Sequence, residues 1–359
     1  MTIAKRPPRS SMRGVTLVEL MVAMVIGLIL MAGVGTVYVN SKRGYRIQQA
    51  ASQVQENGRY AMQFLSRDIR MAGYSGCGAG STRMANVIKN SGTLPWYFDL
   101  TRPILGYNST TTFPSQFASS VVAGTDAVTV VRGDDSKQDV ITHHNPTSAT
   151  FTLAAPSGIP KGTILLVSDC KYSAVFQMSG PTGSTTSAQV DHNTGNAVSP
   201  GNCTKNLGTN GAAYADCNSM SNLTTYTYQG NGQLMRLVAN AYYIGNNADG
   251  VPSLYRAGLT TVGTAPTITN EELVDGVENM QIRYGEAAAP DQAAVRYVPA
   301  DQVTDWGNVV TARVQLLVRS LEQVNPTPVS VTFNGQTYSD RYLRRIFTDT
   351  IKLRNRGLR

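Results

Sequence analysis

Histidine and cysteine are the residues of this chain that could bind a metal ion or act in catalysis, and their spacing fits neither role. The three histidines, His143, His144 and His192, form no HExxH motif, and the sequence contains no CxxC. Because adjacent residues of an extended chain point to opposite faces, His143 and His144 cannot chelate one ion together. We expect all three histidines to be solvated residues in loops.

Asp134, Asp135 and Asp139 form a small acidic cluster that could bind calcium. Their spacing matches no calcium-loop signature, so we expect them to lie in turns. The sequence therefore predicts no enzyme: it offers no catalytic residues, no metal site and no cofactor site.

Four cysteines, an even number, suit two disulfide bonds formed in an oxidising compartment. Cys203 and Cys217 are fourteen residues apart, and a local bridge between them would close a loop that has little core of its own. Cys77 and Cys170 would then form the second bridge. Four cysteines allow three connectivities, and the sequence does not choose among them.

The first forty residues predict a membrane-spanning helix. Val15–Val39 is apolar or small throughout except for Glu19, and Leu20–Val39 alone would be about 30 Å long as a helix, which matches a bilayer core. The segment before it carries four basic residues and no acid, so it should stay in the cytoplasm, with the body in the periplasm. A secretory signal peptide is the alternative, but the apolar run is too long and no A-x-A-like cleavage site closes it.

Glu19 is unusual, because a carboxylate inside an apolar span costs on the order of 3 kcal/mol and normally has a partner. It follows a short basic leader that ends in Gly14 and continues Val15-Thr16-Leu17-Val18. This arrangement resembles the class III signal of type IV prepilins and type II secretion pseudopilins. The resemblance implies that a prepilin peptidase cuts after Gly14 and methylates Val15, although Val15 stands where Phe is commonest.

The same resemblance gives Glu19 a role in assembly. Cleavage creates a positive amine at Val15, and in a filament of packed helices the Glu19 carboxylate of one subunit can pair with the amine of its neighbour. Glu19 would thereby set the register between subunits. Removing one partner of such a buried pair typically costs about 3 to 5 kcal/mol.

Beyond the span, the helix is predicted to continue to about Met71. Small or apolar residues recur every three or four positions, as one buried helical face requires: Ile47, Ala51, Val54, Gly58, Ala61, Leu65, Ile69 and Ala72. The complete helix would be about 85 Å long. The chain then divides into a leader (1–14), a span or filament-core helix (15–39), an amphipathic continuation (40–72) and a head (73–359).

The head is predicted to be an antiparallel β-rich body with long loops, which makes the chain α+β in class. Candidate strands are 127–132, 163–168, 174–178, 234–238, 241–244, 279–284, 309–320 and 344–354. The segment 179–232 is low in apolar residues and rich in Gly, Ser, Thr and Asn, so we expect an irregular insertion there.

Four motifs narrow the resemblance. They are Gly73-Tyr-Ser-Gly-Cys77, Ser168-Asp-Cys170 leading into Ala174-Val-Phe-Gln177, Gly276-Val-Glu-Asn-Met-Gln-Ile-Arg-Tyr-Gly285, and Arg344-Arg-Ile-Phe347 with Leu353-Arg-Asn-Arg356. Together they are similar to the PilW class of minor type IV pilins. The resemblance implies a structural protein that acts by subunit packing, primes type IV pilus assembly and sits at or near the pilus tip.

The partners implied by this resemblance are other minor pilins, the major pilin and a PilY-type tip protein. The prepilin peptidase would be the processing enzyme, and the inner membrane the location before assembly. The J-type pseudopilin of type II secretion is an alternative of similar plan, although it is usually shorter. A DNA-binding minor pilin is a further alternative; it requires an exposed basic patch, and nucleic acid is not the expected partner.

The net charge of +8 is concentrated at the two ends of the chain. Four positive charges lie in the leader, and residues 341–359 hold seven basic residues and one acid. We expect the last strand to be a solvated edge strand whose charges discourage unwanted pairing. The alternative is a basic stripe of Arg344, Lys352 and Arg354 that docks a partner or an anion.

Overall fold

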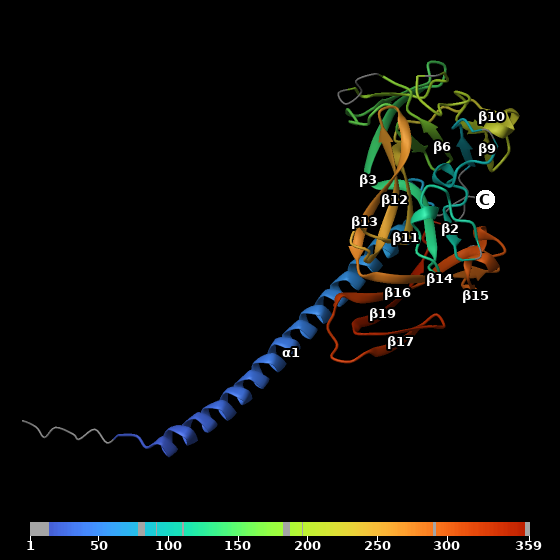
Figure 1. Ribbon diagram of the computed structural model, residues 1–359. Helices are drawn as coiled ribbons and strands as arrows, with labels where there is room; N and C mark the ends of the chain where they lie inside the picture. The colour runs from blue at the N-terminus through green and yellow to red at the C-terminus, as the bar shows by residue number, and fades with distance from the viewer. Residues whose placement is uncertain are drawn as a thin grey trace, which may run out of the picture.

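A single long helix, α1 (Leu17–Met71), carries the head at its C-terminal half, as the computed structural model shows (Figure 1). The structure describes residues 14–77, 83–90, 92–109, 111–181, 187–195, 197–289 and 292–355; the leader before Gly14 lies outside these residues. With 55 residues, the helix is about 80 Å long. The prediction of one continuous helix is confirmed, and so is the β-rich head.

The head is built from two main sheets. An 11-stranded sheet contains β1 (Arg83–Asn86), β2 (Ile104–Tyr107), β3 (Ala127–Asn145), β4 (Thr150–Leu153), β5 (Ile164–Ser168), β6 (Tyr172–Gln177), β7 (Gln189–Asp191), β9 (Tyr214–Asp216), β11 (Gln233–Asn246), β12 (Pro252–Val262) and β13 (Ala265–Asp275). A four-stranded antiparallel sheet has the order β15 (Ala294–Val298), β14 (Val277–Ala287), β16 (Val309–Gln323) and β19 (Tyr342–Lys352).

Two small ribbons complete the strands. They are β8 (Gly208–Thr209) with β10 (Leu223–Thr224), and β17 (Val329–Phe333) with β18 (Gln336–Asp340). Short 3₁₀ turns lie at Trp96–Phe98, Ala118–Ser120, Cys217–Asn222, Ala300–Gln302 and Trp306–Asn308. In Figure 1 the four-stranded sheet lies at the end of the head nearest the free part of α1, and β9 and β10 lie at the opposite end.

Most predicted strands exist, with shifted ends. The two short strands predicted at 234–238 and 241–244 are one strand, β11. The long hairpin of β12 and β13 was not predicted, because its Thr, Asn, Gly and Glu content does not alternate cleanly with apolar residues. The last strand, β19, is the edge strand that the sequence predicts, since it pairs with β16 on one side only among the described residues.

The second half of α1 packs on the four-stranded sheet through one face of small and apolar residues. The buried positions of the helix are Ala50, Val54, Gly58, Ala61, Leu65, Asp68 and Ile69, which confirms most of the predicted face. Opposite them lie inward side chains of the sheet such as Ile282, Val314 and Ile351. Gly58 marks the closest approach: a Cβ built there would lie 2.2 Å from a ring carbon of Phe347.

Asp68 is a charged residue on this otherwise apolar face. Its Oδ1 accepts a hydrogen bond from Nε of Arg132 (3.1 Å), and its Oδ2 accepts from Asn240 (2.6 Å) and from the hydroxyl of Tyr242 (2.7 Å). Arg132 lies on β3, whereas Asn240 and Tyr242 lie on β11. The Asp68 carboxylate therefore joins α1 to the 11-stranded sheet as well, so that the helix contacts both sheets.

We predict opposite effects of alanine at two helix glycines. Gly58→Ala should destabilise the head because the added methyl group meets Phe347, despite the better helix propensity of alanine. Gly44→Ala is the matched control: a Cβ at Gly44 meets nothing within 4 Å, so it should be neutral or stabilise the helix by up to about 1 kcal/mol. The free energy of unfolding in urea, measured on the full chain in detergent, tests both; equal values for the two variants would contradict the packing described.

We also predict that Asp68→Ala destabilises the protein by about 3 kcal/mol, because the buried Arg132 guanidinium loses a carboxylate that is itself buried. The control is Glu322→Ala, which removes an exposed pair with Arg46 and should cost less than about 1 kcal/mol. The same unfolding measurement applies. A loss for Asp68→Ala no larger than that for Glu322→Ala would show that the network does not hold the helix.

Candidate functional site

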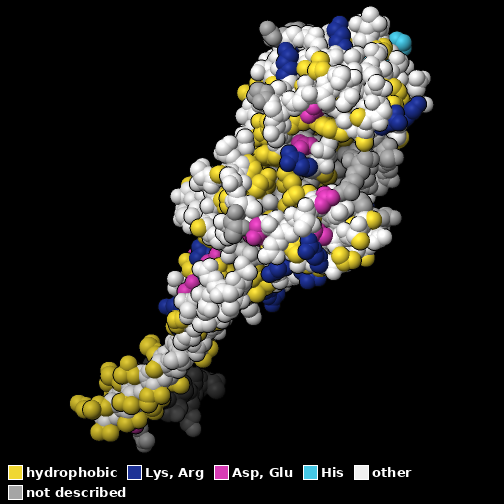
Figure 2. Space-filling model, turned by 90° about the vertical axis from the view of Figure 1, so that its right-hand side faces the viewer, with side chains coloured by type: hydrophobic (Ala, Val, Ile, Leu, Met, Phe, Trp, Pro, Cys, Tyr) yellow, Lys and Arg dark blue, Asp and Glu magenta, His cyan; other side chains and the backbone are white. Residues whose placement is uncertain are grey.

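The first half of α1 is an apolar surface that the rest of the described chain does not cover. Its side chains are largely exposed, for example Leu28 (68%), Met31 (77%) and Tyr38 (67%). The helix is long and apolar enough to cross a membrane, with a mean hydropathy of 2.6 over its best window. Figure 2 shows hydrophobic side chains gathered along this free end, whereas the head carries scattered acidic and basic groups. We call Val15–Val39 the stalk.

The predicted processing site lies directly before the stalk helix. Gly14 and Val15 precede the N-cap residue Thr16 and are exposed. A Cβ built at Gly14 meets nothing within 4 Å, so the fold itself does not need glycine at this position. The processing site at Gly14 therefore stays a prediction that rests on the sequence motif and not on the packing of the fold.

Glu19 forms a capping box with Thr16. The hydroxyl of Thr16 accepts from the backbone N–H of Glu19 (3.2 Å), and Oε2 of Glu19 accepts from the backbone N–H and the hydroxyl of Thr16 (3.0 Å each). Both groups therefore satisfy helix-end donors that would otherwise be unpaired. Oε1 of Glu19 has no hydrogen bond within the described chain, and so one carboxylate oxygen is available to a further donor.

Two disulfide bonds join the four cysteines. Cys77 pairs with Cys170, and Cys203 pairs with Cys217. The first ties the segment after α1 to the residue that follows β5 by two positions. The second closes the loop of the 179–232 segment. The structure thus selects one of the three connectivities that the sequence leaves open.

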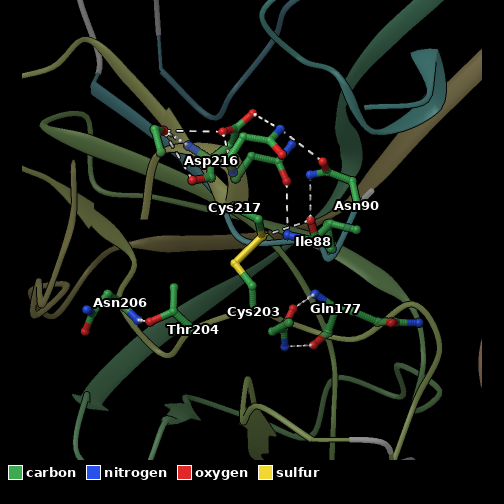
Figure 3. The surroundings of a disulfide bond; sticks show 12 residues. Ile88, Asn90, Gln177, Cys203, Thr204, Asn206, Asp216 and Cys217 are labelled. Carbon is green, nitrogen blue, oxygen red and sulfur yellow. Dashed lines mark hydrogen bonds between the residues drawn. A yellow bond between two sulfur atoms is a disulfide. The ribbon is translucent and has the colours of Figure 1, made fainter. Parts of the chain in front are cut away.

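The segment around Cys203 is joined to the 11-stranded sheet (Figure 3). The backbone N–H of Cys203 donates to the carbonyl oxygen of Val87 (2.9 Å), and the disulfide sulfur of Cys217 lies 3.1 Å from the carbonyl oxygen of Ile88. Asn202 exchanges two hydrogen bonds of 2.7 Å with the backbone of Gln177 in β6. The disulfide loop is therefore hydrogen-bonded both to the chain after β1 and to β6.

The prediction that the histidines are solvated loop residues is wrong for two of the three. His144 in β3 is 2% exposed and His192 is fully buried, and their Nε2 atoms lie 3.1 Å apart. The long-range pairing of β3, β4 and β7 brings them together, which no local motif indicates. Only His143, on the opposite face of β3, is exposed. The acids at 134, 135 and 139 also lie in β3 and not in turns.

The hydrogen bonds define the tautomers of this histidine pair. Nδ1 of His144 accepts from the backbone N–H of Tyr228 (3.1 Å), so neutral His144 carries its proton on Nε2 and donates it to Nε2 of His192. Nδ1 of His192 then carries the proton and has no partner among the described residues. Burial, reinforced by the neighbouring histidines, lowers the pKa of His144 to about 4 and that of His192 to about 3.

The predicted basic stripe is not one accessible surface. The side chain of Arg344 is only 1% exposed and donates to both oxygens of Glu278 (2.6 and 3.0 Å) and to Asp340 (2.8 Å). Lys352 and Arg354 remain exposed. Sequence alternation placed Arg344 on the same face as Lys352, but it could not show that two carboxylates from β14 and β18 neutralise this arginine.

Comparison with known proteins identifies two matching segments. Residues 241–355, from the second half of β11 to just beyond the end of β19, match the family described as Type IV Pilus-assembly protein W, and residues 9–35 match the prokaryotic N-terminal methylation motif. No curated protein and no solved structure matches the chain. The first match contains the motif at 276–285 and all but the last residue of the motif at 344–347 and 353–356, whereas the motifs at 73–77 and 168–177 lie before it.

The histidine pair predicts acid sensitivity. Because the pKa values of His144 and His192 are lowered in the fold, their contribution to stability is complete above about pH 6.5 and is lost as the pH falls toward 4 and 3. Each histidine adds up to about 1.4 kcal/mol per pH unit in this range. Burial raises the pKa of Asp126 to about 6, so protonation of this carboxyl stabilises the fold as the pH falls. The pH dependence of the wild type is therefore the sum of a loss from the histidines and a gain from Asp126.

A variant isolates the histidine contribution. In His192→Leu, the fall in unfolding free energy between pH 6.5 and 4.5 should be shallower than in the wild type, because the unfolded chain takes up one proton fewer. The control, His143→Gln, changes the exposed neighbour and should keep the wild-type slope. An unchanged slope in His192→Leu, measured by urea titration at several pH values, would show that the pair does not couple folding to pH.

Proposed function

We propose that this chain, a type IV pilus minor pilin of the PilW type, primes pilus assembly and sits at or near the pilus tip. The observation that carries the proposal is the stalk: an apolar half-helix that the head leaves bare, preceded by the Gly14–Val15 processing site. The pilin family is structural, and its members assemble with other pilus components. The function proposed is therefore packing of the stalk and choice of partners by the head.

Assembly requires the stalk to leave one apolar environment for another. In the membrane, lipid tails cover its side chains; in a filament, other stalks would cover them. Because lipid tails are as apolar as leucine, the hydrophobic effect does not favour one state over the other. Specific contacts must supply the preference, and Glu19 is the acidic residue of the stalk.

The geometry of the capping box suits Glu19 for this contact. Thr16 holds Oε2 of Glu19 at the first turn of the helix, and Oε1 is left for a new donor. After cleavage, the amine of a neighbouring subunit's Val15 is a donor of the right charge. The contact would compensate on assembly for the cost of placing Glu19 in the membrane.

The size and placement of the head support a position at the tip. One helix carries the entire described part of the head, and β9 and β10 of the 179–232 segment lie at the end of the head farthest from the stalk (Figure 1). A broad head with a long distal insertion suits the end of a filament better than its interior. We propose the inner membrane, with the head in the periplasm, as the location before assembly. The partners proposed are other minor pilins, the major pilin and a PilY-type tip protein, after processing by the prepilin peptidase.

Substitution of Glu19 tests the pairing. Glu19→Ala should reduce surface pili and the co-purification of other minor pilins at least tenfold, since about 3 kcal/mol of pairing energy corresponds to more than a hundredfold in affinity. Thr16→Val, which removes the hydroxyl of the capping box, should have a smaller effect in the same direction. Glu56→Ala is the control, because Glu56 is an exposed acid on the head-bound half of α1. Normal piliation in Glu19→Ala would contradict the pairing.

Deletion of the gene tests the function itself. We expect surface pili and twitching motility to be lost and protein secretion to be retained. Loss of type II secretion with intact pili would instead assign the chain to the pseudopilins. Reintroducing the wild-type gene should restore piliation, and this restored strain is the background in which the Glu19 variants are compared.

A further inference from the structure

The four-stranded sheet has an outer face that carries positive charge. Its inner face packs on α1, and the side chains that alternate with it point outward. In register, Arg283 of β14 lies directly opposite Arg313 of β16, and Arg313 lies opposite Thr350 of β19. Lys352 follows Thr350 by two residues and so shares its face. Arg283, Arg313 and Lys352 are all exposed, and we call them the basic sheet face.

Uncharged side chains surround the basic sheet face and contact its central arginine. At one end of the sheet, the turn of the β17–β18 ribbon covers the outer surface, where Asn334 donates to the side chain of Gln281 (2.7 Å). At the other end, the Arg313 guanidinium lies over the ring of Tyr297, 4.4 Å from its centroid, and its Nε donates to the hydroxyl of Thr350 (3.3 Å). The central arginine is therefore held in place by side chains that carry no charge.

No carboxylate forms an ion pair with the basic sheet face, although the positive charge of Arg283 partly offsets the burial that raises the pKa of the nearby Asp126. Elsewhere in the head, arginines such as Arg132, Arg296 and Arg344 pair with Asp or Glu. Within the described residues, neither Arg283, Arg313 nor Lys352 forms an ion pair. Like charges directly opposite each other on neighbouring strands destabilise a sheet. Their arrangement is explained if an anionic group from outside the chain lies between them.

We propose that the basic sheet face docks carboxylates on the head of a neighbouring pilus subunit. This inference rests on the proposed function and deepens it, because it names a surface by which the head selects its partner. The basic sheet face points away from the α1 of its own subunit, so the head of a neighbouring subunit can reach it when stalks pack side by side. Thr311, Thr348 and Gln315, on the same face, offer neutral hydrogen-bonding groups around the charges.

The position of the face argues against lipid headgroups as the anion. The backbone N–H of Arg354 donates to the carbonyl oxygen of Arg70 (3.0 Å), so this end of β19 lies beside the last turn of α1. Arg70 is about 45 Å along the helix from Val39, where the predicted span ends. Electrostatic attraction to a membrane falls off within a Debye length of about 8 Å at physiological salt.

The number of charges argues against nucleic acid. Three cations replace about three counterions on DNA, whereas proteins that bind DNA through its backbone typically make roughly 6 to 10 phosphate contacts. Three cations are, in contrast, enough to pair with two or three carboxylates on a protein surface. Such pairs give specificity and a marked salt dependence.

The test uses the full chain co-expressed with the other minor pilins and the major pilin of the same pilus, solubilised in mild detergent. The chain is purified by a tag at 0.15 M and at 0.5 M salt, and each recovered pilin is quantified. The variant is the double charge reversal Arg283→Glu with Arg313→Glu. The matched control is Arg236→Glu with Lys171→Glu, which reverses two exposed charges elsewhere on the head, one in β11 and one in the turn between β5 and β6.

We expect the Arg283/Arg313 variant to recover at least tenfold less of one particular pilin at 0.15 M salt, and the wild type to lose that pilin at 0.5 M salt. The control should behave as the wild type, and equal melting temperatures would exclude unfolding as the cause. Equal recovery by the wild type and the Arg283/Arg313 variant at both salt concentrations overturns the proposal while leaving the minor-pilin function standing. If the wild type recovers no other pilin at 0.15 M salt, both the docking proposal and the proposed minor-pilin function fail.

Two further arms separate the alternative anions. The same proteins are applied to a short DNA duplex and to vesicles of anionic phospholipid. We expect no binding that depends on Arg283 and Arg313 in either arm. Binding to either probe that is lost in the Arg283/Arg313 variant would overturn the assignment to a protein partner.

Discussion

One helix has to satisfy two different surroundings, and the other parts of the structure follow from this constraint. Along Val15–Val39 the chain is exposed on every side and, apart from Glu19, its side chains are apolar or small, so this segment must be covered by lipid or by other helices. From Ala50 to Ile69 only one face of α1 is buried. At Gly58 this face has no side chain, so the ring of Phe347 in β19 lies directly against the helix. The exposed half and the half that packs on the head belong to one continuous helix. The head is therefore rigidly coupled to the stalk, and placing the stalk also places the head.

The polar contacts of the helix serve the same coupling. Asp68 reaches Arg132, Asn240 and Tyr242 on two strands of the 11-stranded sheet, while the apolar face of α1 packs on the four-stranded sheet. Cys77 and Cys170 tie the chain just beyond the helix to the strands again. Several arginines of the head, such as Arg132, Arg296 and Arg344, are also used in internal ion pairs. In the basic sheet face, by contrast, two arginines on neighbouring strands lie directly opposite each other without such a pair, and this arrangement marks it as a surface for another molecule.

How far the sequence predicts this structure depends on whether a feature is local. The helix, its buried face and the strands rich in β-branched residues could be predicted, because each has a periodicity within a few residues. The leader motif around Gly14 and Glu19 is likewise contiguous, and it carried the functional interpretation. Features that depend on pairing between distant strands could not be predicted. His144 meets His192 only through β4 and β7, and Arg344 is neutralised by Glu278, sixty-six residues away. The basic sheet face needs the register of three strands, which no single-strand pattern contains.

Glu19 can pair as proposed only if the mature stalk begins at Val15, because only then does a free amine exist for a neighbouring Glu19. The most direct measurement is the intact mass, with N-terminal sequencing, of the protein extracted from membranes of cells that contain the prepilin peptidase. The account predicts a chain that begins at Val15, without residues 1–14, and that carries one added methyl group at its N-terminus. A chain that still contains the leader, or that has been cut after Val39, would contradict it.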